Sequence, residues 1–152
     1  MDASGGTRRR GCGAAHRSLG RRIRRVPAPV LVFISYSHRD ERYREALESH
    51  LTLLHREGVI AAWHDRRISP GDDWEATIDS KLVEAELFIF LVSSDFLASE
   101  YCVGVEVARA MAAHEAGLAR VVPVVIRPVD WQSSPLGQLQ ALPTDAKPIT
   151  KW

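Results

Sequence analysis

The sequence predicts an α/β fold in which a parallel β-sheet is covered by helices on both faces. Short runs of almost uninterrupted apolar residues alternate along the chain with longer segments of helical period, as expected for buried parallel strands and the helices that join them. The chain has 152 residues, 45% of them hydrophobic, which suits one domain with a single core. Its apolar runs are far shorter than the ~20 residues that cross a bilayer.

The first 28 residues differ in composition from the rest of the chain. Eight of the 20 Lys and Arg residues lie within residues 1–30, together with a single acid, and large apolar side chains are scarce there. Such a segment buries too little surface to offset the entropy of ordering. We therefore expect a disordered, Arg-rich tail over residues 1–28 and a domain over residues 29–152. A nucleic-acid arm, a transit-like leader and a start codon placed too far upstream are alternatives to a solvated tail.

The first half of the domain predicts two strands and two helices. Residues 30–34 and 59–63 are the strands. The helix between them, over residues 39–57, is indicated by apolar residues at helical spacing, namely Tyr43, Leu47, Leu51 and Leu54. Gly58 is placed for a left-handed cap of that helix. After a loop with Pro-Gly turn chemistry, Asp72 opens a capping-box pattern for a second helix, whose buried stripe consists of Trp74, Ile78 and Leu82.

The second half predicts three more strands and one more helix. Residues 87–92 form a strand that is apolar on both faces. The helix that follows ends at Gly117 and carries a core-facing stripe of Val103, Val107, Ala110, Met111 and His114. Residues 121–126 are a strand, residues 127–146 a loop with at most one turn of helix, and residues 147–150 a fifth strand. No helix follows that strand, so we expect the domain to be incomplete at its C-terminus.

The ends of two predicted strands place polar side chains where a ligand would bind. In a doubly wound sheet, ligands bind beyond the carboxyl ends of the strands. If strand 30–34 is central and strand 87–92 is its neighbour, the crevice lies between Ser35-Tyr36-Ser37 and residues 93–106. Glu106, near the start of the third helix, then faces a cleft.

Several familiar site chemistries have no counterpart in the sequence. There is no G-x-G-x-x-G after the first strand, no G-x-x-x-x-G-K-[ST] and no G-x-S-x-G, which argues against a dinucleotide-binding Rossmann domain, a P-loop enzyme and a typical serine hydrolase. The six His and two Cys have no metal-ligand spacing, and we expect no metal. A response-regulator receiver would need an acidic pair after the first strand, where Ser-Tyr-Ser stands instead.

Several separate motifs, in a fixed order over residues 31–151, resemble those of bacterial Toll/interleukin-1 receptor (TIR) domains. They are VFISYS at residues 32–37, WHD at 63–65, ISPGDDW at 68–74, LVS at 91–93, FLASEYC at 96–102, and Glu106. The resemblance implies a flavodoxin-like five-stranded parallel sheet of order 2-1-3-4-5. It also implies cleavage of NAD⁺ at its nicotinamide-ribose bond, giving nicotinamide and ADP-ribose or a cyclic variant. NAD⁺ is then the substrate, and no cofactor is expected.

The resemblance also assigns roles to individual residues. The catalytic glutamate of the family follows an aromatic-Cys pair, and that position here is Glu106. A carboxylate at this point is suited to stabilising the oxocarbenium-like charge that develops on the ribose. By analogy, the residues that bind substrate or gate the site are Phe33, Ser35, Tyr36, Ser37, Trp63, Asp65, Trp74 and Tyr101. The loop over residues 66–74 corresponds to the family's main contact between TIR domains.

Each assignment has a purely structural alternative. Glu106 is also spaced to pair with Arg109 on a solvated helix face. Cys102, Trp74 and Tyr36 are also residues that commonly fill a core. The acid lies five residues after Tyr101, whereas four is the common eukaryotic spacing. The other acid nearby, Glu100, precedes the tyrosine.

The sequence is therefore compatible with three functions. We expect an NAD⁺ nucleosidase that is activated by self-assembly and acts in bacterial defence or signalling. The alternatives are a non-catalytic TIR scaffold and a small-ligand sensor. The expected partners are NAD⁺ and other TIR domains, in a homo-oligomer or filament, with no nucleic acid bound by the acidic body and no membrane. Two cysteines in unlike contexts do not form a disulfide framework, so we expect a cytoplasmic protein.

Overall fold

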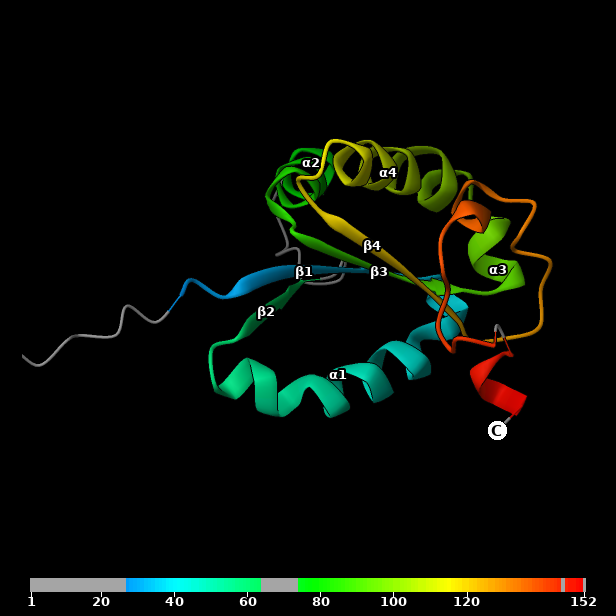
Figure 1. Ribbon diagram of the computed structural model, residues 1–152, viewed down its shortest axis with the longest axis horizontal. Coiled ribbons are helices and arrows are strands. Elements are labelled where there is room, and N and C mark those ends of the chain that lie inside the picture. Colours follow the sequence, from blue (N-terminus) through cyan, green and yellow to red (C-terminus); the bar gives the residue numbers. More distant parts are fainter. Residues whose placement is uncertain (1–26, 64–73, 146, 152) are drawn as a thin grey trace, which may run out of the picture.

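A computed structural model describes residues 27–63, 74–145 and 147–151 (Figure 1). In these ranges the chain forms a parallel sheet of four strands in the order β2-β1-β3-β4. The strands are β1 (Val30–Ser35), β2 (Ile60–Trp63), β3 (Leu87–Val92) and β4 (Arg120–Val125). All three pairings are parallel. The predicted α/β class and the relative order of these four strands are confirmed.

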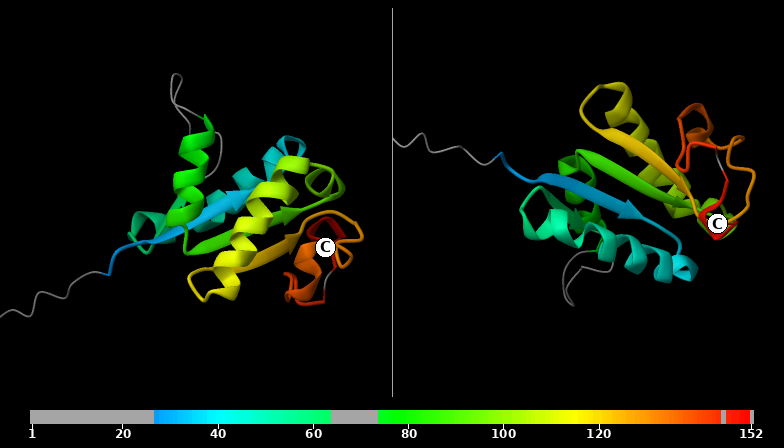
Figure 2. Two further views of the ribbon diagram at one scale, coloured as in Figure 1. Left: turned by 90° about the horizontal axis from the view of Figure 1, so that it is seen from above. Right: turned by 60° about the horizontal axis from the view of Figure 1, so that its bottom comes forward.

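Helices lie on both faces of the sheet. α1 (Glu41–Arg56) covers one face, while α2 (Trp74–Glu84) and α4 (Ala108–Glu115) lie over the other (Figures 1 and 2). A short helix, α3 (Ser94–Leu97), and a π-helix, η3 (Cys102–Val107), join β3 to α4. The two glycines predicted to end helices, Gly58 and Gly117, have φ of 70° and 71°, which few other residues adopt without strain.

The side chains of the strands divide between two hydrophobic cores. Alternate residues of a strand point to opposite faces, so Phe33, Phe88 and Phe90 pack beneath α2 and α4. Ile34 and Leu91 pack on the α1 side. The same alternation continues at the carboxyl end of β1: Ser35, two residues after Phe33, faces η3 and α4, whereas Tyr36 belongs to the α1 core. The pattern of β1 thus determines which polar side chain reaches the η3 side.

The predicted fifth strand over residues 147–150 is wrong. Ile149 and Thr150 belong to η5 (Ile149–Lys151), a 3₁₀ turn, and the sheet has four strands within the described ranges. Pro148 lacks the N–H that a strand ladder requires at every second residue. Beside β4 the chain instead makes a single bridge, in which the Leu142 N–H donates to the Pro123 carbonyl and the Leu142 carbonyl accepts from Val125. The predicted single turn in the preceding loop is confirmed as η4 (Pro135–Gln138).

Two predictions lie outside the described residues. One is the disordered tail, because the structure describes nothing before residue 27. The other is the capping box at Asp72 and the loop before it, since residues 64–73 are not described. The limits of the domain over residues 29–152 remain a prediction.

An ion cluster ties the carboxyl ends of three strands together. Asp40, in the short helix η1 (His38–Asp40), is fully buried and accepts a hydrogen bond from Ser93 Oγ at 2.5 Å. Its other carboxylate oxygen lies 2.7 Å from Arg127 Nη2. Arg127 also binds Asp95, which in turn contacts Arg39 at 3.3 Å. The loop after β1 is therefore fixed to the ends of β3 and β4.

This cluster predicts an acid-sensitive part of the stability. The hydrogen bond from Arg127 holds the pKa of Asp95 below its usual range, and the charges of Arg127 and Arg39 act in the same direction. A carboxyl whose pKa is lowered by folding stabilises the folded protein at pH values above about 3.9, the pKa of Asp in the unfolded chain. This contribution is lost as the pH falls from there through the lower pKa of the folded state. Asp95→Asn is expected to have a lower melting temperature than the wild type at neutral pH. This difference in melting temperature is expected to become smaller below about pH 4. Thermal melts from pH 7 to pH 3 check this, and a pH-independent difference would contradict it.

Candidate active site

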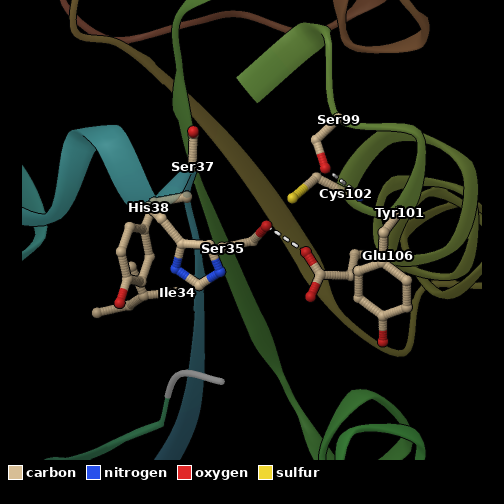
Figure 3. A pocket seen from close by; sticks show the side chains of 9 residues that line it. Ile34, Ser35, Ser37, His38, Ser99, Tyr101, Cys102 and Glu106 are labelled. Atoms are coloured by element: carbon tan, nitrogen blue, oxygen red, sulfur yellow. Dashed lines mark hydrogen bonds between the residues drawn. The ribbon is translucent and has the colours of Figure 1, made fainter. Parts of the chain in front are cut away.

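A cavity of about 270 Å³ opens at the carboxyl end of β1. One wall comes from the end of β1 and the following turn, and the other from η3 and the residues that lead into it (Figure 3). The lining residues are Ile34, Ser35, Tyr36, Ser37, His38, Ser99, Tyr101, Cys102 and Glu106. The volume is near the lower limit for ligand pockets, about 300 Å³. It therefore suits one ring or sugar rather than a whole dinucleotide.

The two walls meet in a hydrogen bond between Ser35 and Glu106. Ser35 Oγ donates to Glu106 Oε2, joining residues 71 positions apart in the chain (Figure 3). Both residues are buried: Ser35 is 3% exposed and Glu106 is 3% exposed. A carboxylate costs free energy when it leaves water unless it is paired and hydrogen-bonded, and hydroxyl donation to the carboxylate offsets part of that cost. The predicted placement of Glu106 at a cleft is thus observed.

Glu106 does not lie on a solvated helix face paired with Arg109, which was the structural alternative. Arg109, the cation three residues further on, pairs with Asp79 of α2, with Nη1 and Oδ1 2.7 Å apart. That pair is half-exposed and joins two helices above the core. Glu106 points the other way, into the cavity and toward β1 (Figure 3).

Tyr101 forms part of the wall beside Glu106. Burial raises the pKa of its hydroxyl to about 12, and the neighbouring Glu106 carboxylate acts in the same direction. Tyr101 therefore stays neutral throughout the physiological range. It supplies an aromatic surface and a hydroxyl, and it does not act as a base near neutral pH.

The π-helix accounts for the five-residue interval between Tyr101 and Glu106. In a π turn, hydrogen bonds join residues five apart, so residues i and i+5 occupy places that i and i+4 occupy in an α-helix. η3 covers all but the first residue of this interval. Tyr101 and Glu106 consequently line the same cavity although their spacing is one residue longer than the common one. The wider turn of the π-helix accommodates the one extra residue between Tyr101 and Glu106.

Deleting Gly104 is expected to leave the domain folded. Gly104 is exposed on η3, and a Cβ at its position would have no neighbour within 4 Å. Its removal lets the π turn close as an α-helix with Tyr101 four residues before the acid. Deletion of the exposed Ala108, two residues after Glu106, instead rotates Ala110 and Met111 by about 100° off the core. Circular-dichroism melts compare the two variants. Equal loss of structure in both would contradict this account of the turn.

The other predicted site residues have different places. Ser37 and Tyr36 line the cavity, although the Tyr36 ring is largely buried on the α1 side and its hydroxyl donates to Glu41 at 3.3 Å. Phe33 is 1% exposed and lies in the core, outside the cavity lining. Trp63 ends β2 and Trp74 begins α2. Their side chains, like all of Asp65, lie outside the described part of the structure, so their roles remain predictions.

Four lining residues had no predicted role in the site, namely Ile34 of β1, His38, Ser99 and Cys102. His38 lies in the turn after β1, Ser99 lies at the approach to η3, and Cys102 lies at the start of η3. The Ser99 hydroxyl accepts a hydrogen bond from the Cys102 N–H at 3.3 Å. A sequence signal existed for His38, because it comes three residues after the last residue of β1, where ligands of this sheet type bind. The spacing of the six histidines, which argues against a metal site, does not reveal this role.

The described residues contain neither a cluster of metal-binding side chains nor a membrane-spanning helix. Within them, no cluster of three or more His, Cys, Asp or Glu side chains has the arrangement of a metal site. Among the helices in these ranges, none has the length and apolar character needed to span a membrane.

The fold and the site define a TIR domain. The family model described as TIR domain matches residues 32–149, and the chain belongs to this family. Among solved structures, the chain is similar to the TIR domain of the Toll-related receptor TRR-2 from Hydra magnipapillata, with a TM-score of 0.56 and 20% identity. That alignment covers 73% of this chain and 81% of the receptor domain. At this identity the likeness supports the fold alone.

A sequence relative comes from a bacterium. The chain is 49% identical over 121 residues to the uncharacterized protein y4lF of Sinorhizobium fredii (strain NBRC 101917 / NGR234). The match covers 80% of this chain and 38% of the relative. The chain therefore spans well under half the length of that relative.

Proposed function

We propose that this TIR domain is an NAD⁺ nucleosidase, and that Glu106 is its catalytic carboxylate. The observation that carries the proposal is the burial of Glu106 at the wall of a cavity, with its carboxylate bound to Ser35 rather than to the nearby Arg109. An acid with only a structural role on a helix surface would be cheaper to keep in water. Buried ionisable groups in clefts are candidates for functional sites.

The reaction needs little more than a positioned negative charge. Nicotinamide is bound to the ribose as a cationic pyridinium and leaves as a neutral ring, so neither a metal nor a strong acid is required for its departure. The barrier lies in the positive charge that develops on the ribose. Glu106 stabilises that charge and holds ribose hydroxyls, as carboxylates do in glycoside hydrolysis. Ser35 fixes the carboxylate, and Tyr101 forms the adjoining wall.

The size of the cavity limits what it holds. About 270 Å³ accommodates the nicotinamide or the ribose attached to it, while the adenylate half of NAD⁺ lies outside. Ser37 and Tyr36 line the cavity. We assign Phe33, Trp63, Asp65 and Trp74 to substrate binding or gating by family analogy only. The products are nicotinamide and ADP-ribose or a cyclic variant.

We further propose that other TIR domains are the protein partners, and that self-assembly into a homo-oligomer or filament switches the enzyme on. This rests on the behaviour of the family, as do a cytoplasmic location and a role in bacterial defence or signalling. A non-catalytic TIR scaffold is the alternative.

The proposal is tested by turnover. The purified protein is immobilised at high density on beads, so that copies are forced together, and is incubated with NAD⁺. Chromatography then measures nicotinamide, ADP-ribose and cyclic products. Release of nicotinamide supports the nucleosidase. Absence of release from folded, clustered protein favours the scaffold.

A further inference from the structure

We propose that His38 is a second catalytic residue, and that it accepts the proton of the water that attacks the ribosyl cation. The inference rests on the proposed NAD⁺ nucleosidase activity. It concerns the step after nicotinamide has left, in which water attacks the ribose and must lose a proton.

The position of His38 is fixed by the fold. It opens η1 directly behind β1, and its imidazole lines the cavity on the β1 wall, with Glu106 on the wall opposite (Figure 3). The residue is exposed at the surface, so water reaches it. The turn that carries it is held by two backbone bonds, from the Asp40 N–H to the Ser37 carbonyl at 2.7 Å and from the Glu41 N–H to the His38 carbonyl.

The ion cluster behind the turn adds to this fixation. Asp40, two residues after His38, is fully buried between Ser93 and Arg127. A side chain that takes a proton in a reaction must keep its place relative to the reacting atoms. The buried anchor at Asp40 provides this for a residue that is itself exposed.

The chemistry of the other lining side chains leaves His38 as the suitable base. The pKa of the Tyr101 hydroxyl is raised to about 12, so this hydroxyl stays protonated near neutral pH and cannot accept a proton from water. Serine hydroxyls are poor bases near neutral pH. Glu106 has to remain charged to stabilise the ribosyl cation, and it already accepts from Ser35. Histidine is the side chain that most often serves as a general base in enzymes.

The proposed step balances as follows. The bond between the ribose anomeric carbon and the pyridinium nitrogen breaks, and its electron pair stays with the departing neutral nicotinamide. The oxygen of a water molecule then forms a bond to the anomeric carbon. The proton that this oxygen loses goes to the imidazole of His38 and from there to solvent. No oxidation or reduction takes place, and the other product is ADP-ribose.

This role predicts a split between two reactions of the same cation. Hydrolysis needs a proton acceptor, whereas exchange of nicotinamide for an added pyridine, such as 3-acetylpyridine, does not. His38→Gln is expected to lower hydrolysis about 100-fold and to leave pyridine exchange within about twofold, since general-base assistance acts on the water step alone. Added imidazole is expected to restore part of the hydrolysis in His38→Ala.

The controls separate this inference from the proposed function. His55→Gln, an exposed substitution on α1 outside the cavity lining, is expected to leave both rates unchanged. Glu106→Gln is expected to lose both, because no cation forms. Unchanged hydrolysis in His38→Gln, or an equal loss of hydrolysis and exchange with no rescue by imidazole, would overturn the role of His38. A wild-type protein that performs neither reaction would overturn the proposed function and this inference together.

Discussion

Glu106→Gln is expected to reduce NAD⁺ cleavage about 100- to 1,000-fold, the loss typical when a preorganised stabiliser of transition-state charge is removed. Glutamine has nearly the same shape and still accepts a hydrogen bond from Ser35. It lacks the negative charge that opposes the cation on the ribose. The melting temperature is expected to stay within a few degrees of wild type, because burying a neutral amide at this site costs less than burying a carboxylate. Rates of nicotinamide release and thermal melts measure the two effects.

Glu100→Gln is the matched control for this substitution. Glu100 is the other acid near Tyr101, and it is exposed rather than buried. Its replacement is expected to change neither the rate nor the melt. If Glu100→Gln were inactive and Glu106→Gln active, the assignment of the carboxylate would be reversed. If both variants kept full activity, the site proposed here would not be the catalytic one.

Val107→Asp is expected to destabilise the domain by more than about 4 kcal/mol, a large part of the roughly 5–15 kcal/mol that stabilises a typical domain. Val107 is 1% exposed and packs in the core under α2 and α4. A charge there would have to leave water without a partner, or the core would have to open. Urea denaturation followed by circular dichroism gives the free energy of unfolding, or shows that no folded state remains.

Ala108→Asp serves as the control for Val107→Asp. Ala108 is the next residue and is exposed, so a charged side chain at this position stays in water. This variant is expected to unfold at about the wild-type denaturant concentration. A similar loss of stability in both variants would mean that the helix, and not the burial of Val107, controls the result.

The sequence contained enough information to locate the sheet and its ligand-binding edge. The strand over residues 87–92 was predicted with the bounds that the structure has, because it is apolar on both faces and flanked by polar turns. Two glycines at helix ends were correctly identified from their conformational freedom. The position of Glu106 at a cleft followed from the strand order expected for such a sheet.

Other features depended on long-range packing or on local signals that were missed. The bond between Ser35 and Glu106 and the cluster around Asp40 join residues more than 50 positions apart, and no periodicity encodes such pairs. The π turn at η3 has no simple sequence rule. α3, by contrast, had a signal, since Ser93 is an N-cap residue whose hydroxyl accepts from the Phe96 N–H. The predicted fifth strand is wrong, and the signal against it is Pro148, which has no N–H to donate to a strand ladder.

Nicotinamide release from NAD⁺ by bead-clustered protein, with wild type beside Glu106→Gln and both checked for folding, tests the central claim most directly. The account predicts steady release by the wild type and a rate at or near background for the variant. Equal rates for the two folded proteins would contradict the assignment of Glu106. No release from the folded, clustered wild type would contradict the enzyme itself.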